Sequence, residues 1–167
     1  MNLINLVKEI CNLHSRFIFK SVDEVIEPMK DLRKVNQIKH YYELVKNKYS
    51  IFRENIKNII SEDSISIFDK IKNNFELIGN QLSSYPLNFC HGDYKSPNIF
   101  YKTNGDIIIL DWHYIHLGKG VSDLVFLLVE SVDFDINTCN SIRQLYYKLY
   151  SEKNKYYSLS QLNMNLI

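Results

Sequence analysis

The chain is short of the residues and runs that mark several protein classes. Its 167 residues include three prolines and three cysteines, and the cysteines lie too far apart for a paired metal or redox motif. The longest apolar run, residues 124–129, is far shorter than the ~20 residues of a membrane-spanning helix, and no signal-like start is visible. We therefore expect neither membrane insertion nor secretion, and the scattered thiols favour a reducing, cytoplasmic location.

An excess of charge of one sign is also lacking. Twenty basic and nineteen acidic residues leave a formal charge of +1, so we expect no general attraction to nucleic acid or to an anionic membrane surface. The content of 46% hydrophobic and 23% charged residues is typical of a globular protein. No repeat, proline-rich linker or low-complexity tract divides the chain, and the sequence predicts a single domain over residues 1–167.

Most of the chain has the hydrophobic periodicity of α-helices. Apolar residues recur at helical spacing over 3–13, 38–45 and 64–82. Residues 121–130 are apolar on nearly every side, which predicts a helix buried on all sides. A last helix is expected over about 138–150, with Asp135 or Asn137 as its cap. The pattern predicts an α+β fold that is mostly α-helical.

Three oxygen-bearing side chains stand at fixed offsets near the middle of the chain. Asp93 is followed five positions later by Asn98, and a run of four aliphatic residues leads into Asp111. Between them Asn104-Gly105 is a pair that tolerates positive φ in a tight turn, so we expect a β-hairpin. The return of the hairpin would bring Asn98 and Asp111 side by side.

This set of side chains suits a hard cation and a hydroxyl group. Mg²⁺ takes oxygen ligands, usually one or two carboxylates together with substrate phosphates, and Asn98 and Asp111 can supply the protein ligands. Asp93 is then free to accept a proton from an attacking hydroxyl or to orient it, and Lys95 can lean toward the transferred phosphoryl group. Taken alone, Asp93 would be a turn aspartate after glycine, but the set of three favours a catalytic site.

The pattern H-G-D-x-x-x-x-N, a hairpin and a strand ending in D-W span residues 88–112. They resemble the catalytic loop and metal strand of the aminoglycoside phosphotransferase and choline kinase superfamily, which is related to the protein kinases. The resemblance implies that Asp93 is the catalytic acid and that Asn98 and Asp111 hold Mg²⁺.

The neighbours of these residues bear on which branch of the superfamily the chain resembles. Gly92 stands where protein kinases have arginine and Trp112 where they have phenylalanine, and both favour the small-molecule branch. Lys95 points toward the protein kinases, in which a lysine follows the catalytic acid by two residues, and its contact with phosphate is one possibility. We interpret His91 as a structural histidine that braces the loop near Asp111.

Two further segments resemble the same superfamily. Residues 118–124 match its G-x-x-x-x-D-L element, in which the acid opens a buried helix and tethers the catalytic loop, so Asp123 is implied to be a structural carboxylate. Residues 6–14 resemble the L-x-x-L-H helix that follows the hinge between the two lobes of a kinase. By contrast, His113 and His116 lack a third ligand at zinc-like spacing and are assigned to a loop or the surface.

Kinases of this superfamily bind ATP between two lobes, and the N-terminal lobe supplies a glycine-rich loop, a strand lysine and a glutamate. The five glycines of this chain, at positions 79, 92, 105, 118 and 120, form no such loop. The sequence therefore predicts the C-terminal lobe of a protein-kinase-like fold with the N-terminal β-lobe absent. A fragment, a truncated product or a degenerate relative is expected, complemented by a partner chain or by the missing lobe.

Three functional hypotheses stay open on this basis. The first is an ATP-dependent phosphotransferase that uses Mg²⁺ to move the γ-phosphate of ATP to the hydroxyl of a small molecule. The alternative is a catalytically inactive, pseudokinase-type interaction module. In the third, an adjacent reading frame encodes the missing lobe, and this chain is half of an active enzyme. The acceptor substrate and the oligomeric state leave no signature in the sequence.

Overall fold

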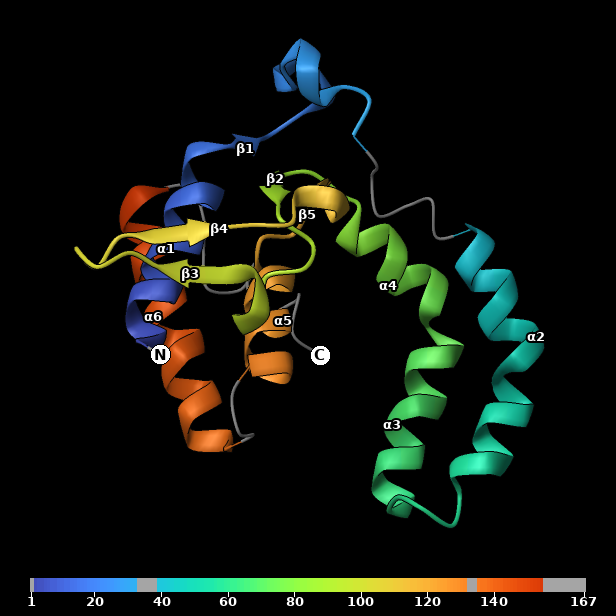
Figure 1. Ribbon diagram of the computed structural model, residues 1–167. Coiled ribbons are helices and arrows are strands. Elements are labelled where there is room, and N and C mark those ends of the chain that lie inside the picture. Colours follow the sequence, from blue (N-terminus) through green and yellow to red (C-terminus); the bar gives the residue numbers. More distant parts are fainter. Residues whose placement is uncertain (1, 33–38, 132–134, 155–167) are drawn as a thin grey trace. The chain divides into compact units, whose positions relative to one another are not determined.

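The computed structural model describes residues 2–32, 39–131 and 135–154 (Figure 1). The chain forms two compact units, one made of Met1–Arg33 with Tyr85–Ile167 and the other of Lys34–Ser84. All the side chains assigned above to catalysis and metal binding belong to the first unit. Among the described helices, none combines the length and the apolar character that crossing a membrane requires.

Three helices form the body of the first unit, namely α1 (Leu3–Arg16), α5 (Val121–Ser131) and α6 (Ile136–Lys153). The side chain of Asn2 begins α1 by accepting the backbone N–H of Asn5, and Asp135 begins α6 by accepting the N–H of Thr138. Of the two caps that the sequence allowed for the last helix, Asp135 is therefore the one used. The helices predicted over 3–13 and 138–150 are confirmed.

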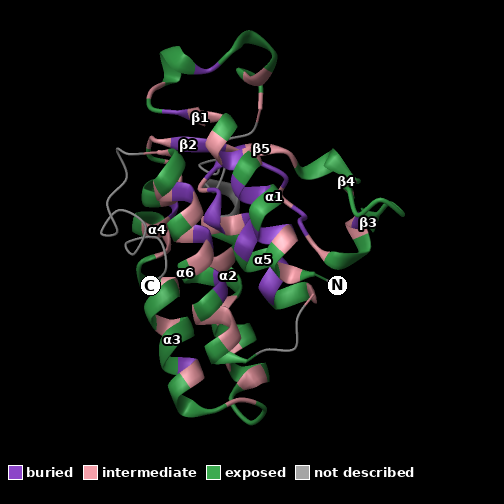
Figure 2. Ribbon diagram, turned by 90° about the vertical axis from the view of Figure 1, so that its left-hand side faces the viewer, coloured by how far each residue is buried: buried purple, intermediate pink, exposed green. Residues whose placement is uncertain are grey.

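The core of the first unit lies where these helices face one another (Figure 2). It is built from side chains of all three helices, including Leu6, Val7, Ile10, Leu124, Leu127, Ile142, Tyr146 and Tyr150. The prediction that residues 121–130 are buried on all sides is wrong, because Val125, Phe126 and Val129 on α5 are exposed. An apolar sequence on every face of a short helix thus does not guarantee that every face is covered.

A small sheet and a hairpin complete the first unit. The antiparallel sheet has the strand order β1 (Ile18–Phe19), β2 (Leu87–Cys90) and β5 (His116–Gly118). The hairpin pairs β3 (Ile99–Tyr101) with β4 (Ile107–Ile109), so that Ile99 faces Ile109. The predicted hairpin is confirmed. Among the described residues, 3₁₀ turns connect these elements at η1 (Val22–Glu24), η2 (Glu27–Met29), η4 (Ser96–Asn98) and η5 (Trp112–Tyr114).

The turn of the hairpin uses one of the two residues expected to reverse the chain. Gly105 has φ +87°, whereas Asn104 is not in the left-handed region. The N–H of Lys102 donates to the carbonyl of Asp106 at 2.8 Å, and the side chain of Asn104 donates to the Asp106 carboxylate at 2.8 Å. The loop is therefore longer than a two-residue turn, and Asn104 stabilises it through its side chain.

In the second unit, the structure describes the helices α2 (Lys39–Ile56), α3 (Glu62–Asn73) and α4 (Phe75–Leu82). The sequence predicted one helix over 64–82, and the structure divides it at Asn74, whose backbone has φ −111° and ψ 14°. The backbone N–H and the side chain of Asn74 both donate to the carbonyl of Lys70, at 3.1 and 2.8 Å, so that Asn74 ends α3 and precedes α4. Residue 38, the first of the predicted segment 38–45, lies outside the described residues.

Candidate active site

The loop that follows β2 places Asp93 in a largely buried position, with 7% of the residue exposed. Lys95 forms an ion pair with Oδ1 of the carboxylate at 2.9 Å. Asn98 donates from Nδ2 to Oδ2 at 2.9 Å and to the backbone carbonyl of Asp93, also at 2.9 Å. Tyr94 anchors the loop from inside, because its side chain is fully buried and its hydroxyl donates to the carbonyl of Leu6 at 3.0 Å. We call residues 91–98 the acid loop.

The contacts of Asn98 decide which way its amide points. Both partners of its side chain are oxygen atoms of Asp93 that accept hydrogen bonds, so the atom facing them must be the nitrogen. The opposite atom, Oδ1, accepts no hydrogen bond from the described residues. An amide oxygen held in this way is suited to a hard cation such as Mg²⁺.

Asp111 follows Leu110 just beyond the end of β4 and has an unusual backbone conformation. The N–H of Leu110 donates to the carbonyl of Asn98 at 2.9 Å, which extends the hairpin pairing to the residue before Asp111. Asp111 itself has φ 62° and ψ 66°, in the left-handed region that residues other than glycine rarely adopt. Such conformations cluster at functional sites. The Asp111 side chain is 42% exposed and is therefore accessible to a ligand.

The charges around Asp111 couple it to its neighbours. A hydrogen bond from the ring of His113 holds the pKa of the Asp111 carboxyl below its ordinary value. The same contact raises the pKa of His113. The pKa of Lys95 is raised first by its bond to Asp93, and Asp111 contributes to that rise from further away. The ammonium of Lys95 therefore lies within the field of both acids.

The structure brings the predicted residues together in different degrees. Asp93, Lys95 and Asn98 are in direct contact through their side chains. Asp111 is joined to Asn98 through the backbone bond at Leu110, and no side-chain contact between these two residues occurs in the described part of the chain.

His91 connects the acid loop to the end of β4. Its Nε2 lies 2.9 Å from the carbonyl of Leu110, which can only accept, so Nε2 carries the proton. Its Nδ1 then accepts the backbone N–H of Asp93 at 3.2 Å. The ring also meets Trp112 edge to face, with ring centroids 4.6 Å apart. A neutral His91 thus fixes both the start of the acid loop and the residues that follow the strand.

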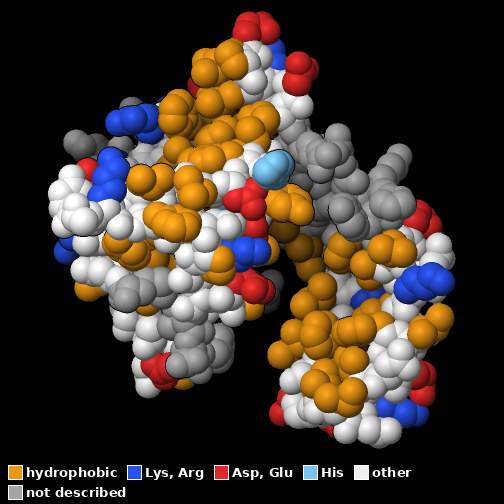
Figure 3. All heavy atoms as spheres, in the orientation of Figure 1, with side chains coloured by type: hydrophobic (Ala, Val, Ile, Leu, Met, Phe, Trp, Pro, Cys, Tyr) orange, Lys and Arg blue, Asp and Glu red, His pale blue; other side chains and the backbone are white. Residues whose placement is uncertain are grey.

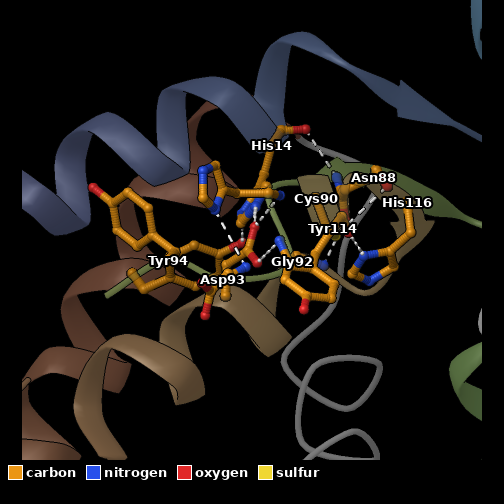
Figure 4. A network of polar contacts seen from close by, with 12 residues as sticks. His14, Asn88, Cys90, Gly92, Asp93, Tyr94, Tyr114 and His116 are labelled. Atoms are coloured by element: carbon orange, nitrogen blue, oxygen red, sulfur yellow. Dashed lines mark hydrogen bonds and ion pairs between the residues drawn. The ribbon is translucent and has the colours of Figure 1, made fainter. Parts of the chain in front are cut away.

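Asp123, in the first turn of α5, binds the start of the acid loop. Figure 4 shows the surrounding network, with His14, Gly92 and Asp93 labelled. Oδ1 of Asp123 accepts the N–H of Gly92 at 2.8 Å, and its Oδ2 accepts the N–H of His91 at 2.7 Å and Nε2 of His14 at 3.0 Å. Burial alone would raise the pKa of this carboxyl, but the bonds from His14 and from the two amides outweigh it and leave the pKa below the ordinary value. Asp123 is therefore an ionised, fully satisfied buried acid.

Gly92 is required by its surroundings as well as by its backbone. It has φ +84°, and a Cβ at this position would lie 2.2 Å from the carbonyl oxygen of Tyr114. The segment that follows β4 therefore passes close to the acid loop at Gly92. A side chain at position 92 would have to displace backbone, which is more costly than displacing a flexible side chain.

A second glycine allows an equally close approach behind the loop. A Cβ at Gly120 would lie 2.5 Å from Nδ1 of His14 and 2.8 Å from the hydroxyl of Tyr146. The backbone N–H of Gly120 donates to Oδ1 of Asn88 at 3.1 Å, and Nδ2 of Asn88 donates to the carbonyl of His14 at 2.8 Å. Sequence reasoning missed the supporting roles of Asn88, Gly120 and Tyr146. Asn88 and Tyr146 carry polar groups at buried positions, but a single sequence does not show whether a polar side chain is buried or lies on the surface.

One group of side chains has the composition of a metal site but not its chemistry. The ligand-type atoms of His14, Cys90 and Asp123 lie within 4.8 Å of one another in the buried interior. Both oxygens of Asp123 already accept hydrogen bonds, and burial raises the pKa of the Cys90 thiol well above its ordinary value, which disfavours the thiolate that a metal needs. We interpret this group as part of the support of the acid loop.

Comparisons with known proteins agree with this architecture. The family model described as "Ecdysteroid kinase-like family" matches residues 10–156. Among solved structures, the crystal structure of choline kinase from Cryptosporidium parvum Iowa II is similar, with a TM-score of 0.53 and 15% sequence identity. The match covers 98% of this chain and 53% of the choline kinase, so the chain spans about half the length of that protein. A search among curated proteins gives no significant match.

The two comparisons support different conclusions. At 15% identity the structural likeness shows the fold, which is the mostly helical α+β fold of the C-terminal lobe of a protein-kinase-like protein. The family match extends over most of the chain and includes the acid loop, the hairpin and Asp123. The chain therefore belongs to the ecdysteroid kinase-like family.

Proposed function

We propose that the chain forms the catalytic lobe of an ATP-dependent phosphotransferase that transfers the γ-phosphate of ATP to the hydroxyl of a small molecule. The observation that carries this proposal is the state of Asp93. Its carboxylate is largely buried and held by Lys95 and Asn98 at 2.9 Å each, and Asn98 is joined through the backbone to Leu110, the residue before Asp111. A purely structural loop needs neither the paired acid nor the amide with a free oxygen.

The residues present fit a magnesium ion in the donors that they offer. Oδ1 of Asn98 accepts no hydrogen bond from the described residues, and the carboxylate of Asp111 is partly exposed. Mg²⁺ is usually held by one or two such oxygen groups together with phosphates. When bound, Mg²⁺ would neutralise the phosphate charge during transfer. His113, which now contacts Asp111, would have to share or release this carboxylate.

The remaining roles follow from the contacts of Asp93. An acceptor hydroxyl that donates to Oδ1 or Oδ2 would replace the bond from Lys95 or from Asn98. Because Lys95 is long and partly exposed, we assign the exchange to Oδ1, and the released ammonium would lie near the incoming phosphoryl group. Asp93 would then orient the hydroxyl and accept its proton.

The family and the structural neighbour suggest the first acceptors to test. The family is named for ecdysteroid kinases and the neighbour is a choline kinase, so we propose a small hydroxylated acceptor such as an ecdysteroid or choline. A cytoplasmic site of action belongs to the same proposal, because ATP is plentiful there.

The test combines binding with turnover. Calorimetric titration with Mg²⁺ and ATP is expected to show binding by the wild-type chain and weaker binding by Asp111→Asn. ADP release with an ecdysteroid or choline is expected to fall about 100-fold or more in Asp93→Asn while nucleotide binding is retained. Equal loss of binding and turnover in Asp93→Asn would contradict the role given to Asp93.

One observation favours the second hypothesis, a pseudokinase-type interaction module. Large apolar side chains on and just after the hairpin are exposed, namely Phe100, Ile108, Leu110 and Trp112, and Figure 3 shows hydrophobic side chains gathered on the face that carries β3 and β4. Exposed apolar patches often mark interaction sites. Absence of Mg²⁺ and ATP binding, together with tight binding of a protein partner at this face, would favour the module over the enzyme.

A further inference from the structure

The hydroxyl of Tyr146 faces a chain of buried hydrogen bonds that ends at the acid loop. It lies 2.8 Å from Nδ1 of His14, whose Nε2 lies 3.0 Å from Oδ2 of Asp123. Asp123 in turn accepts the amides of His91 and Gly92 at 2.7 and 2.8 Å. The three linking side chains are at most 2% exposed. Three elements far apart in the sequence, α6, α1 and α5, are therefore connected in series to the loop.

The direction of each bond follows from the chemistry of the partners. The Asp123 carboxylate can only accept, so the proton between Asp123 and His14 belongs to Nε2. In a neutral His14, Nδ1 is then an acceptor, and the hydroxyl of Tyr146 is its donor. Without that donor, Nδ1 would be buried with no partner, and the ring could turn or exchange its proton between the two nitrogens.

The surroundings of the pair show that the contact is built into the fold. Gly120 leaves space for it, since a Cβ there would lie 2.5 Å from the ring of His14 and 2.8 Å from the Tyr146 hydroxyl. The next tyrosine along the same face of α6, Tyr150, stacks on Tyr146 with ring centroids 5.7 Å apart and accepts a hydrogen bond from Asn88 at 2.8 Å. The ring of Tyr146 is thus held in place independently of its hydroxyl.

We infer that Tyr146 is a positioning residue, whose hydroxyl acts through His14 and Asp123 to fix the amides that present Asp93. The structural part of this inference stands on the contacts above, and only its kinetic consequence rests on the proposed function. The residue does not touch the reacting groups. Together with the Asp123 carboxylate, which accepts the Nε2 proton, its hydroxyl holds the His14 ring in the one tautomer and orientation that supports Asp123.

The decisive variant is Tyr146→Phe, which removes the hydroxyl and keeps the ring. Tyr147→Phe is the matched control on the same helix, because Tyr147 packs at the edge of the same core and its hydroxyl makes no hydrogen bond with the described residues. Nitrogen NMR of the His14 ring is expected to show the Nε2–H tautomer in the wild type and in Tyr147→Phe. In Tyr146→Phe we expect a mixture of tautomers.

The loop itself gives the second readout. The loss of one buried hydrogen bond corresponds to about a tenfold change in an equilibrium constant, so amide exchange at Gly92 is expected to be about tenfold faster in Tyr146→Phe and unchanged in Tyr147→Phe. If the proposed function holds, kcat falls by about the same factor while KM for ATP is unchanged.

Two results would overturn the inference, and neither depends on turnover. One is a wild-type His14 whose proton is on Nδ1, which can be measured even if Tyr146→Phe does not fold. The other is a folded Tyr146→Phe in which the His14 tautomer and the exchange of Gly92 match those of the control. An inactive wild-type chain with the expected spectra would instead contradict the proposed function and leave the positioning role supported.

Discussion

The side-chain amide of Asn98 donates to two oxygens of Asp93, one on the carboxylate and one on the backbone, both at 2.9 Å. The proposed metal ligand and the proposed catalytic acid are therefore one hydrogen-bonded unit. A change at either residue reaches the other, so loss of metal binding and loss of acid function are separable only with variants that keep part of this contact.

Asn98→Asp is such a variant. It keeps an oxygen for Mg²⁺ but removes both donors and places a second carboxylate beside Asp93, and like charges at this distance disfavour each other. We expect Mg²⁺ and ATP binding to persist in calorimetry while turnover falls about 100-fold or more. Asn98→Ala, which removes the oxygen as well, serves as the comparison and is expected to lose both. Undiminished turnover in Asn98→Asp would show that the function of Asp93 does not depend on the hydrogen bonds from Asn98, and it would contradict the claim that the two residues act as one unit.

Gly92 and Gly105 offer a matched pair of substitutions to alanine. Both have positive φ, +84° and +87°, but only at Gly92 would the new Cβ meet other atoms, 2.2 Å from the carbonyl oxygen of Tyr114. We expect Gly105→Ala to cost about 1 kcal/mol of unfolding free energy, from backbone strain alone. Gly92→Ala should cost on the order of 3 kcal/mol or more, because backbone must also move. Denaturant titration of the two variants measures the difference, and equal losses would show that the passage of Tyr114 is not tightly constrained.

Asp123→Asn tests the buried carboxylate and its dependence on pH. An asparagine has one accepting oxygen, so it leaves the N–H of Gly92 or of His91 without a partner, at a cost of roughly 3 kcal/mol. The pKa of Asp123 is lowered from its ordinary 3.8 in the folded chain, so its contribution to stability is present above that value and is lost as the pH falls through the folded pKa.

The free energies of unfolding of wild type and Asp123→Asn, measured from neutral pH downward, provide this test. The difference between them is expected to be largest near neutral pH and to shrink below pH 3.8. A difference that stays constant into strong acid would mean that Asp123 is not ionised in the folded chain.

His113 should make magnesium binding depend on pH. Its contact with Asp111 raises its pKa above the ordinary 6.5, so it stays cationic to a higher pH and competes for the same carboxylate. The stabilising contact is present below 6.5 and is lost as the pH rises through the raised pKa. We therefore expect the affinity for Mg²⁺ and ATP to rise with pH through this range in the wild type and to rise less in His113→Gln.

His116→Gln is the control for this effect, since the ring of His116 contacts the carbonyl of Tyr114 at 3.0 Å and makes no contact with Asp111. Protonation of ATP affects all three proteins equally. Identical pH profiles for wild type and His113→Gln would exclude competition at Asp111.

The sequence predicted which helices and strands form better than it predicted where they end and which buried residues support the acid loop. The hairpin was predictable because two short apolar runs flank a glycine that the turn requires. The break at Asn74 was not, because it depends on the backbone conformation and the side-chain bond of a single residue. The apolar periodicity continues across this residue and therefore does not reveal the break.

The candidate site shows the same division. Asp93, Asn98 and Asp111 could be proposed from spacing, since strand pairing brings the two ends of a hairpin together. The supporting residues could not, because Tyr146 and Asn88 meet His14 only after α6, β2 and α1 have packed. Contacts between residues 132 positions apart, as between His14 and Tyr146, leave no local pattern in a single chain.

The backbone of Tyr114 crosses the face of Gly92 so closely that the path of one segment dictates the residue allowed on the other. A larger residue at position 92 would therefore require the segment that follows β4 to take another path. An arginine could not be introduced here by substitution alone, because its Cβ would already meet the backbone of Tyr114.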